Sequence, residues 1–272
     1  YGTPMVLMTI PMFTNHESIE GLYFDSSITT PFHFVTVSGV AESPSNPVGG
    51  LSYINGDFDR GVRYMKELGV DYFISYTDSI TDKAIMSDEL ENLFQSSPFT
   101  VFKIYSDKVQ VVDAELVNFS QPELFERISN SIFRQEKTDS FFNLAMKEFK
   151  LDNKKRIIEG IDTEESQIQN RIPGKKSEIN NVRISNNEIT FETDHPNELH
   201  IVKVSYFPNW KIENGSGPYR LSPSFMGVIP YSNEVSITFE NTSLEKSLNI
   251  ISLIIFLLTA YLLVFRIKKY AE

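Results

Sequence analysis

The chain has 272 residues, of which 41% are hydrophobic and 22% charged, and this composition is typical of a folded protein of about two domains. The formal net charge of −11 argues against nucleic acid as a partner, because phosphate binding needs a basic face. The chain has no cysteine, which excludes disulfides and cysteine-ligated metals.

Residues 1–118 are predicted to form a small α/β domain. Within it, residues 32–40 alternate in a way that favours a strand. Asp57 or Asp59 can cap a helix through "RGVRYMKEL", which Gly69 ends. The apolar face of this helix is formed by Val62, Met65 and Leu68.

Three further elements complete the prediction for this domain. The run "VDYFISY" indicates a buried strand, because it is rich in β-branched and aromatic residues. A second helix is predicted over residues 84–94. The runs "FTVFKIY" and "VQVVDAEL" are predicted to pair as a hairpin across residues 106–108.

Residues 119–178 are predicted to be a helical segment followed by a linker. Ser120 and Glu123 fit a capping box, and apolar residues follow at helical spacing. The tract 152–176 is charged and weakly patterned, which is typical of a linker.

Residues 179–243 change to a period of two. The runs "NEITFET", "LHIVKVSYF", "FMGVIPY" and "EVSITFE" are separated by turn residues. This pattern predicts an antiparallel, immunoglobulin-like β-sandwich, so the fold class is α+β.

Residues 248–265, "LNIISLIIFLLTAYLLVF", carry no charge and predict a transmembrane helix. At a rise of ~1.5 Å per residue the run is ~27 Å long, close to the thickness of the hydrocarbon core. The tail 266–272 contains Arg266, Lys268 and Lys269, so the positive-inside tendency predicts a cytoplasmic C-terminus and an extracytoplasmic N-terminal part. We therefore expect a cell-membrane protein with one C-terminal span.

The stretch "SYFPNWKIENGSGPYRLSPSF" contains the single tryptophan of the chain, Trp210. Pro208 interrupts the alternation and marks an edge or a bulge, because proline cannot donate to a strand ladder. Trp210 is expected to pack inside the sandwich and not to stack on a ligand. Trp210, Pro208 and Tyr219 are therefore assigned structural roles.

The same stretch, continued through "MGVIPYSNEVSITFENT" into an apolar helix, resembles the end of bacterial and archaeal multi-spanning membrane proteins with a glycosyltransferase-C-like core. These are often catalogued as pyruvoyl-tetrahydropterin synthase-related membrane proteins. "IEGLYFDSSITTPFHF", "SPSNPVGGLSY" and "FDRGVRYMKELGVDYFISYTD" are similar to the region that precedes their β-domain. The resemblance covers most of the chain except 152–176.

The resemblance implies an extracytoplasmic β-domain in front of a closing transmembrane helix. In glycosyltransferase-C enzymes the catalytic carboxylate lies on an early loop between membrane helices that this chain does not contain. The chain itself is therefore predicted to be non-catalytic, although its parent protein would be a glycosyltransferase. A pterin-synthase type of zinc site is not predicted, because the four histidines lack the required spacing: His16, His33, His195 and His200.

A ligand site of the chain's own, if it has one, is predicted around Glu20, Tyr23, Asp25 and His33. Carboxylates accept hydroxyl protons and aromatic rings cover apolar sugar faces, so this mixture suits a glycan. The alternative is a loop in which these side chains make structural hydrogen bonds, and we expect this scaffold role. Asn55, Asp57 and Asp59 have the look of a calcium loop without its later glutamate, so capping is favoured. No metal and no cofactor is predicted.

Two functions remain open from the sequence. The first is the extracytoplasmic part of a glycosyltransferase-C-like envelope protein, acting as a scaffold or handling an acceptor or lipid-linked sugar. The second is a self-standing single-pass subunit that binds a protein partner. Both have the lipid bilayer as a partner, and the first adds other membrane segments or subunits. The mature polypeptide would have 31.1 kDa in the second case and two or three times that in the first.

Overall fold

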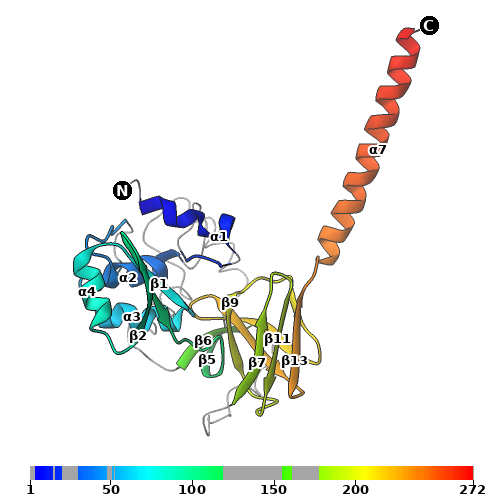
Figure 1. Cartoon of the computed structure of the whole chain (residues 1–272). Helices are drawn as coiled ribbons and strands as arrows, with labels where there is room; N and C mark the ends of the chain where they lie inside the picture. Colours follow the sequence, from blue (N-terminus) through cyan, green and yellow to red (C-terminus); the bar gives the residue numbers. More distant parts are fainter. Residues whose placement is uncertain are drawn as a thin grey trace.

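The computed structural model describes residues 4–14, 16–19, 30–47, 51, 53–118, 155–160 and 178–271. These residues form helices and mainly antiparallel sheets, followed by a long apolar helix (Figure 1). The α+β class predicted from the sequence is confirmed at this level.

The N-terminal part combines short helices with a three-stranded antiparallel sheet in the order β1-β3-β2. Its helical elements are η1 (Pro4–Thr9), α1 (Ile10–Phe13), α2 (Thr30–Val40), α3 (Phe58–Glu67) and α4 (Asp78–Ile85). Its strands are β1 (Tyr72–Ser75), β2 (Leu90–Ser96) and β3 (Phe99–Ile104).

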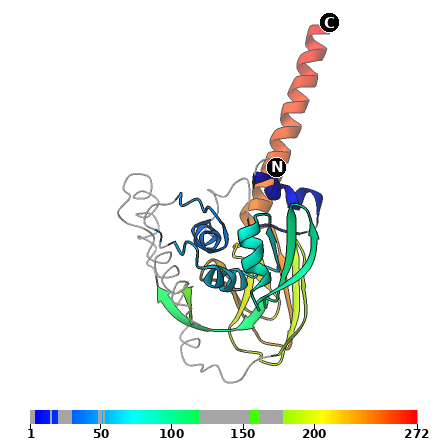
Figure 2. The same cartoon turned by 60° about the vertical axis from the view of Figure 1, so that its left-hand side comes forward.

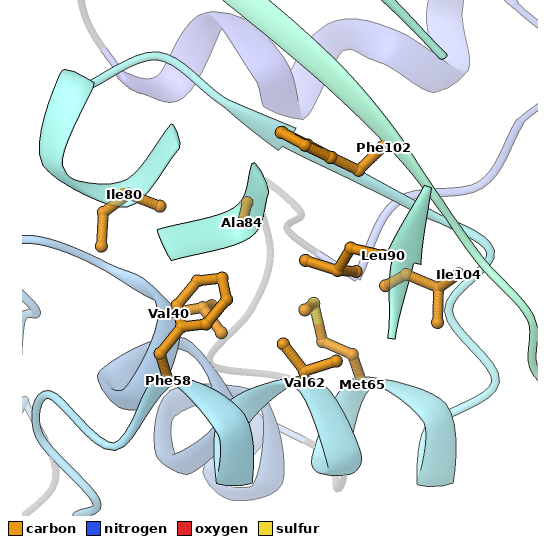
Figure 3. Close-up of a cluster of buried hydrophobic side chains, with 9 residues drawn as sticks. All are labelled: Val40, Phe58, Val62, Met65, Ile80, Ala84, Leu90, Phe102 and Ile104. Atoms are coloured by element: carbon orange, nitrogen blue, oxygen red, sulfur yellow. The ribbon is translucent and has the colours of Figure 1, made fainter. Parts of the chain in front are cut away.

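Helix α3 covers one face of this sheet. Asp57 is its N-cap and accepts a hydrogen bond from the backbone N–H of Arg60 at 3.2 Å, as the sequence predicted. Val62 and Met65 point from α3 towards Phe102 and Ile104 of β3 (Figure 3). The cluster also contains Val40, Phe58, Ile80, Ala84 and Leu90. Burial of this apolar face is the main source of stability for the N-terminal part.

Two elements of the N-terminal part differ from their prediction. Residues 32–40 lie in helix α2 and not in a strand, because the buried positions Phe32, Val35 and Val40 repeat at helical spacing. The helix predicted over 84–94 is wrong: α4 ends at Ile85, and 90–96 form strand β2. The run "VDYFISY" does contain a strand, β1, but the strand is not buried as predicted: Tyr72 is exposed and Ser75 is its one buried residue.

The predicted hairpin of "FTVFKIY" with "VQVVDAEL" is also wrong. Strand β3 pairs with β1 and β2, whereas β4 (Val109–Val111) pairs with β9 of the second half of the chain. Strand β5 (Asp113–Asn118) pairs in parallel with β6 (Lys155–Gly160). The segment 1–118 therefore supplies two strands to the larger sheet.

The C-terminal part contains two sheets, with the orders β10-β13-β8-β7 and β4-β9-β12-β11-β6-β5. The strands not yet given are β7 (Ile179–Ile184), β8 (Glu188–Thr193), β9 (His200–Ser205), β10 (Trp210–Ile212), β11 (Gly215–Leu221), β12 (Phe225–Pro230) and β13 (Glu234–Phe239). Of the predicted helical segment and linker, 119–178, the described residues are 155–160 and 178, and 155–160 are a strand. The rest of that prediction lies outside the described residues.

The two sheets share one core and so form a sandwich. Ile189 and Phe191 of β8 meet Met226 and Val228 of β12, and Trp210 joins the same cluster. The immunoglobulin-like order is not confirmed. The last strand, β13, lies between β8 and β10, in the same sheet as β7. In an immunoglobulin domain the last strand instead lies in the sheet that does not contain the first strand.

The antiparallel pairs of the sandwich include strands that are distant in the sequence. Strand β13 pairs with both β8 and β10, and strand β12 pairs with both β9 and β11.

The two parts of the chain meet at the C-terminus of α3. Leu68 packs against Ile201 and the rest of a second cluster on the outer face of the larger sheet. Lys203 of β9 donates from Nζ to the backbone O of Lys66 at 2.8 Å, and Lys108 donates to the backbone O of Gly69. Both lysines satisfy carbonyls at the negative end of the helix. The sandwich therefore completes the capping of α3.

Candidate functional site

Helix α7 (Ser243–Ala271) follows the last strand of the sandwich after three residues. Among the residues that the structure describes, its part Ser243–Leu263 is the one helix long and apolar enough to cross a membrane. None of that window is buried within the structure, and Figures 1 and 2 show α7 standing clear of the folded part. An apolar helix exposed on every side needs an apolar surrounding.

The first turn of α7 is closed by a capping box. The backbone N–H of Glu245 donates to Thr242 Oγ1 at 3.2 Å, and the backbone N–H of Thr242 donates to Glu245 Oε2 at 2.6 Å. The Thr242 hydroxyl also donates to Glu245 Oε2, at 2.8 Å. The helix start is thereby fixed at one residue.

The same carboxylate ties α7 to the sandwich. Asn209, which is buried in the turn between β9 and β10, donates from Nδ2 to Glu245 Oε2 at 2.7 Å. The backbone O of Asn209 accepts from the N–H of Glu240 at 2.9 Å. We call Asn209, Glu240, Thr242 and Glu245 the junction.

The three residues assigned structural roles lie in and around this region. Trp210 is 6% exposed, and its ring meets that of Phe239 edge-on at a centroid distance of 5.2 Å. Pro208 is exposed in the turn between β9 and β10. Tyr219 of β11 packs against the cluster on the outer face of the larger sheet. The core position of Trp210 agrees with the expectation from the sequence.

The predicted ligand site is described at one position. Glu20, Tyr23 and Asp25 lie outside the described residues, so their meeting with His33 in one pocket stays a prediction. His33 lies on α2, and its Nδ1 is buried without a hydrogen-bond partner. Burial lowers the pKa of His33 from 6.5 to about 4, so the imidazole is neutral at pH 7.

A second imidazole cluster, not predicted from the sequence, lies at the turn between β8 and β9, in "TDHPNELH". His200 is fully buried, and its Nδ1–H donates to the backbone O of Glu198 at 2.8 Å. Its Nε2 then accepts from the hydroxyl of Thr193 at 2.8 Å. His195 Nδ1 is 3.2 Å from Glu198 Oε1. Burial, as the largest cause, lowers the pKa of His200.

This cluster holds the turn together and offers no open reaction centre. The Thr193–His200 pair has the distance of a nucleophile and its base, but both side chains are buried, and Thr193 Oγ1 also accepts from the backbone N–H of His195 at 3.1 Å. His195 and His200 stand on either side of a turn that brings them together. Their close spacing around turn residues was the signal in the sequence that could have indicated this cluster. Within the described ranges no group of three His, Cys, Asp or Glu side chains is placed to hold a metal.

The chain was compared with known proteins at three levels. No family model, no curated protein and no solved structure matches it.

The stability of the chain is expected to fall on mild acidification. Unfolded histidine has a pKa near 6.5, whereas His33 in the fold has a pKa of about 4 and that of His200 is also lowered. Between these values the unfolded state binds more protons, so stability is complete above pH 6.5 and is lost as the pH falls. At 1.36 kcal/mol per pH unit, His33 alone accounts for up to about 3 kcal/mol.

Urea unfolding in detergent at pH 7.5, 6 and 5 measures this dependence. His33→Leu should flatten the slope of stability against pH, while the control His16→Leu, at an exposed position, should keep it. Equal slopes for the wild type and His33→Leu would contradict the prediction.

Proposed function

We propose that the chain is the extracytoplasmic, membrane-anchored part of an envelope protein with a glycosyltransferase-C-like core, and that it acts as a scaffold without chemistry of its own. The proposal takes its class from the motifs around "YFPNW" and "GPYRLSP" and its orientation from Arg266, Lys268 and Lys269 behind the apolar run. In such a protein the scaffold stands beside the membrane segments that handle a lipid-linked sugar or a surface glycopolymer.

The single observation that carries the scaffold role is the junction. Asn209 and Thr242 bind the same carboxylate oxygen of Glu245, so the sandwich and the helix share a hydrogen-bonded corner. A module that only needed an anchor could be joined by a flexible linker, whereas here the helix begins three residues after β13. This supports a fixed height of the sandwich above the bilayer.

The hydrogen bonds of the imidazole groups agree with a scaffold. His200 has both ring nitrogens hydrogen-bonded inside the fold, and His195 is held by Glu198. General acid–base catalysis needs such a group within reach of a substrate proton. In the described part of the chain these side chains are instead used to hold the β8–β9 turn.

Cells that lack the gene test the function. We expect less surface glycopolymer and more lipid-linked sugar, with recovery by the wild type but not by a double variant of the junction, Asn209→Ala with Glu245→Ala. Lys83→Ala, at an exposed lysine on α4 in the N-terminal part, is the control and should restore the phenotype. Unchanged glycopolymer after deletion would contradict the envelope-glycan role.

The topology is tested separately in the cysteine-free chain. A membrane-impermeant maleimide should label Tyr231→Cys on intact cells, and Tyr270→Cys only after permeabilisation. The reverse pattern would contradict the proposed orientation.

A self-standing subunit that binds a protein partner is the second candidate. It is favoured by exposed aromatic side chains on the three-stranded sheet, Tyr72, Tyr76 and Phe94. Ring-on-ring packing of Tyr76 with Phe99 extends this surface. A mature polypeptide of 31.1 kDa on a denaturing gel would support this candidate against the first.

A further inference from the structure

We propose that the sandwich itself binds the lipid surface through its tip, which we define as Phe207, Pro208 and Phe239. The tip would lie in the headgroup layer beside α7, with Phe207 at the boundary between headgroups and acyl chains. This inference rests on the proposed function, because it takes α7 to span the membrane.

The tip is fastened to the first turn of α7. Phe207 and Pro208 immediately precede Asn209, whose side chain is bonded to Glu245 and whose backbone O is bonded to Glu240. Phe239 ends β13, the strand that leads into the helix. Figure 1 shows α7 leaving the sandwich at this end of β13. The tip therefore cannot move independently of the helix start.

The depth of the tip follows from helix geometry. Glu245 precedes Leu248, the start of the apolar run, by three positions. At 1.5 Å per residue the junction lies about 4.5 Å from the hydrocarbon edge along the helix axis. The headgroup layer is roughly 5–8 Å thick on each side of the core. A turn bonded to Glu245 is thus at the height of the headgroups.

The chemistry of the tip suits that height. The rings of Phe207 and Phe239 stack with centroids 6.0 Å apart, and the side chains are 52% and 37% exposed. Trp210 supports Phe239 from inside the core. Lys211 and Lys246 both pair with Glu240, the residue that follows Phe239. Apolar rings on a rigid base, next to such a charged group, are a combination that suits a membrane interface.

Helix α1 adds a second apolar surface on the same side. Met12 and Phe13 are exposed, and Figure 1 shows α1 at the edge of the folded part on the side towards which α7 extends. A single exposed phenylalanine is common on soluble proteins. Exposed apolar groups on α1 and at the tip, both on the side towards which α7 extends, are better explained by a common lipid surface.

The test uses single cysteines, because the chain has none. Phe207→Cys and Tyr231→Cys are labelled with the environment-sensitive dye NBD and placed in phosphatidylcholine nanodiscs, with and without doxyl-labelled lipid. Tyr231 is the matched control: it is also 52% exposed but follows β12 at the opposite end of β13. We expect a blue-shifted emission and several-fold stronger quenching by doxyl lipid at position 207 than at position 231.

The outcomes separate this inference from the proposed function. Failure of the chain to enter nanodiscs would overturn the membrane anchor itself. Incorporation with equal, weak quenching at both positions would overturn the lipid contact alone. A blue shift at position 207 without doxyl quenching would also overturn it, because protein and not lipid would then cover the tip.

A label-free readout removes the effect of the dye. Trp210 is the only tryptophan and lies three residues from Phe207, so brominated lipid should quench its emission. Phe207→Ser should weaken this quenching, while Tyr231→Ser should leave it unchanged. An unaltered Trp210 emission in detergent verifies that both variants keep the sandwich folded, and equal quenching in both would contradict the role of Phe207.

Discussion

Replacing Trp210 by alanine is expected to lower the free energy of unfolding of the sandwich by about 3–5 kcal/mol. The indole is 6% exposed and lies among side chains of both sheets, including Val235 and Ile237 of β13 and Met226 of β12. Its removal would leave a cavity lined by strands whose pairing fixes their positions, so the site cannot collapse to fill it.

Urea unfolding of the detergent-solubilised chain measures this loss, and hydrogen exchange locates it. Exchange should rise over β10 and β13 and remain unchanged over α3. Tyr231→Ala, which removes an exposed ring from the same sandwich, is the control and should cost less than about 1 kcal/mol. If Trp210→Ala unfolds at the same urea concentration as Tyr231→Ala, Trp210 is not a core residue.

Local signals in the sequence were sufficient for helix α3. Its capping residue Asp57, its buried positions Val62 and Met65 and its end at Gly69 all lie within the thirteen residues 57–69.

 The backbone φ is +74° at Gly69 and +79° at Gly56, and this left-handed conformation favours glycine at both turns. Because cap, apolar face and stop were all local, this helix could be predicted from its own residues.

Helix α2 was mistaken for a strand because of its composition. Its β-branched and aromatic residues favour a strand by propensity, and Phe32 and Phe34 start an alternating pattern. Tertiary packing outweighs this propensity, because Phe32, Val35 and Thr36 are buried on one helical face. The Thr36 hydroxyl also donates to the backbone O of Phe32 at 2.8 Å. Propensity is a weak guide where packing competes with it.

The pairing of the sheets and the complete junction could not be predicted, because both depend on contacts between residues far apart in the sequence. Strand β4 pairs with β9, whose residues are about ninety positions away, and no local pattern carries that information. The capping box of Thr242 and Glu245 was readable from the sequence, since the residues have the required spacing. Its third member, Asn209, comes from a distant turn and became visible only in the fold.

Replacing Gly39 by valine is expected to destabilise the N-terminal part by about 3 kcal/mol or more. A Cβ at position 39 would lie 2.8 Å from the backbone O of Asp57 and 3.0 Å from Cα of Gly61. Both atoms belong to the backbone at the start of α3, so neither can rotate away. The Asp57 oxygen also accepts the N–H of Gly61 at 3.0 Å, so a shift of α3 would disturb its first turn.

The smaller change, Gly39→Ala, tests the sign of the effect. Alanine gains up to about 1 kcal/mol over glycine in a helix interior, and less near the end of α2, where Gly39 lies. Overpacking against backbone typically costs about 1–3 kcal/mol, so the clash should win and Gly39→Ala should also destabilise. Ala41→Val, two residues later at a partly exposed position, is the control and should change stability by less than about 1 kcal/mol. Hydrogen exchange over α3 measures the effect of both variants. If Gly39→Val keeps the wild-type protection of α3 from exchange, then α2 and α3 do not cross at Gly39 and Gly61.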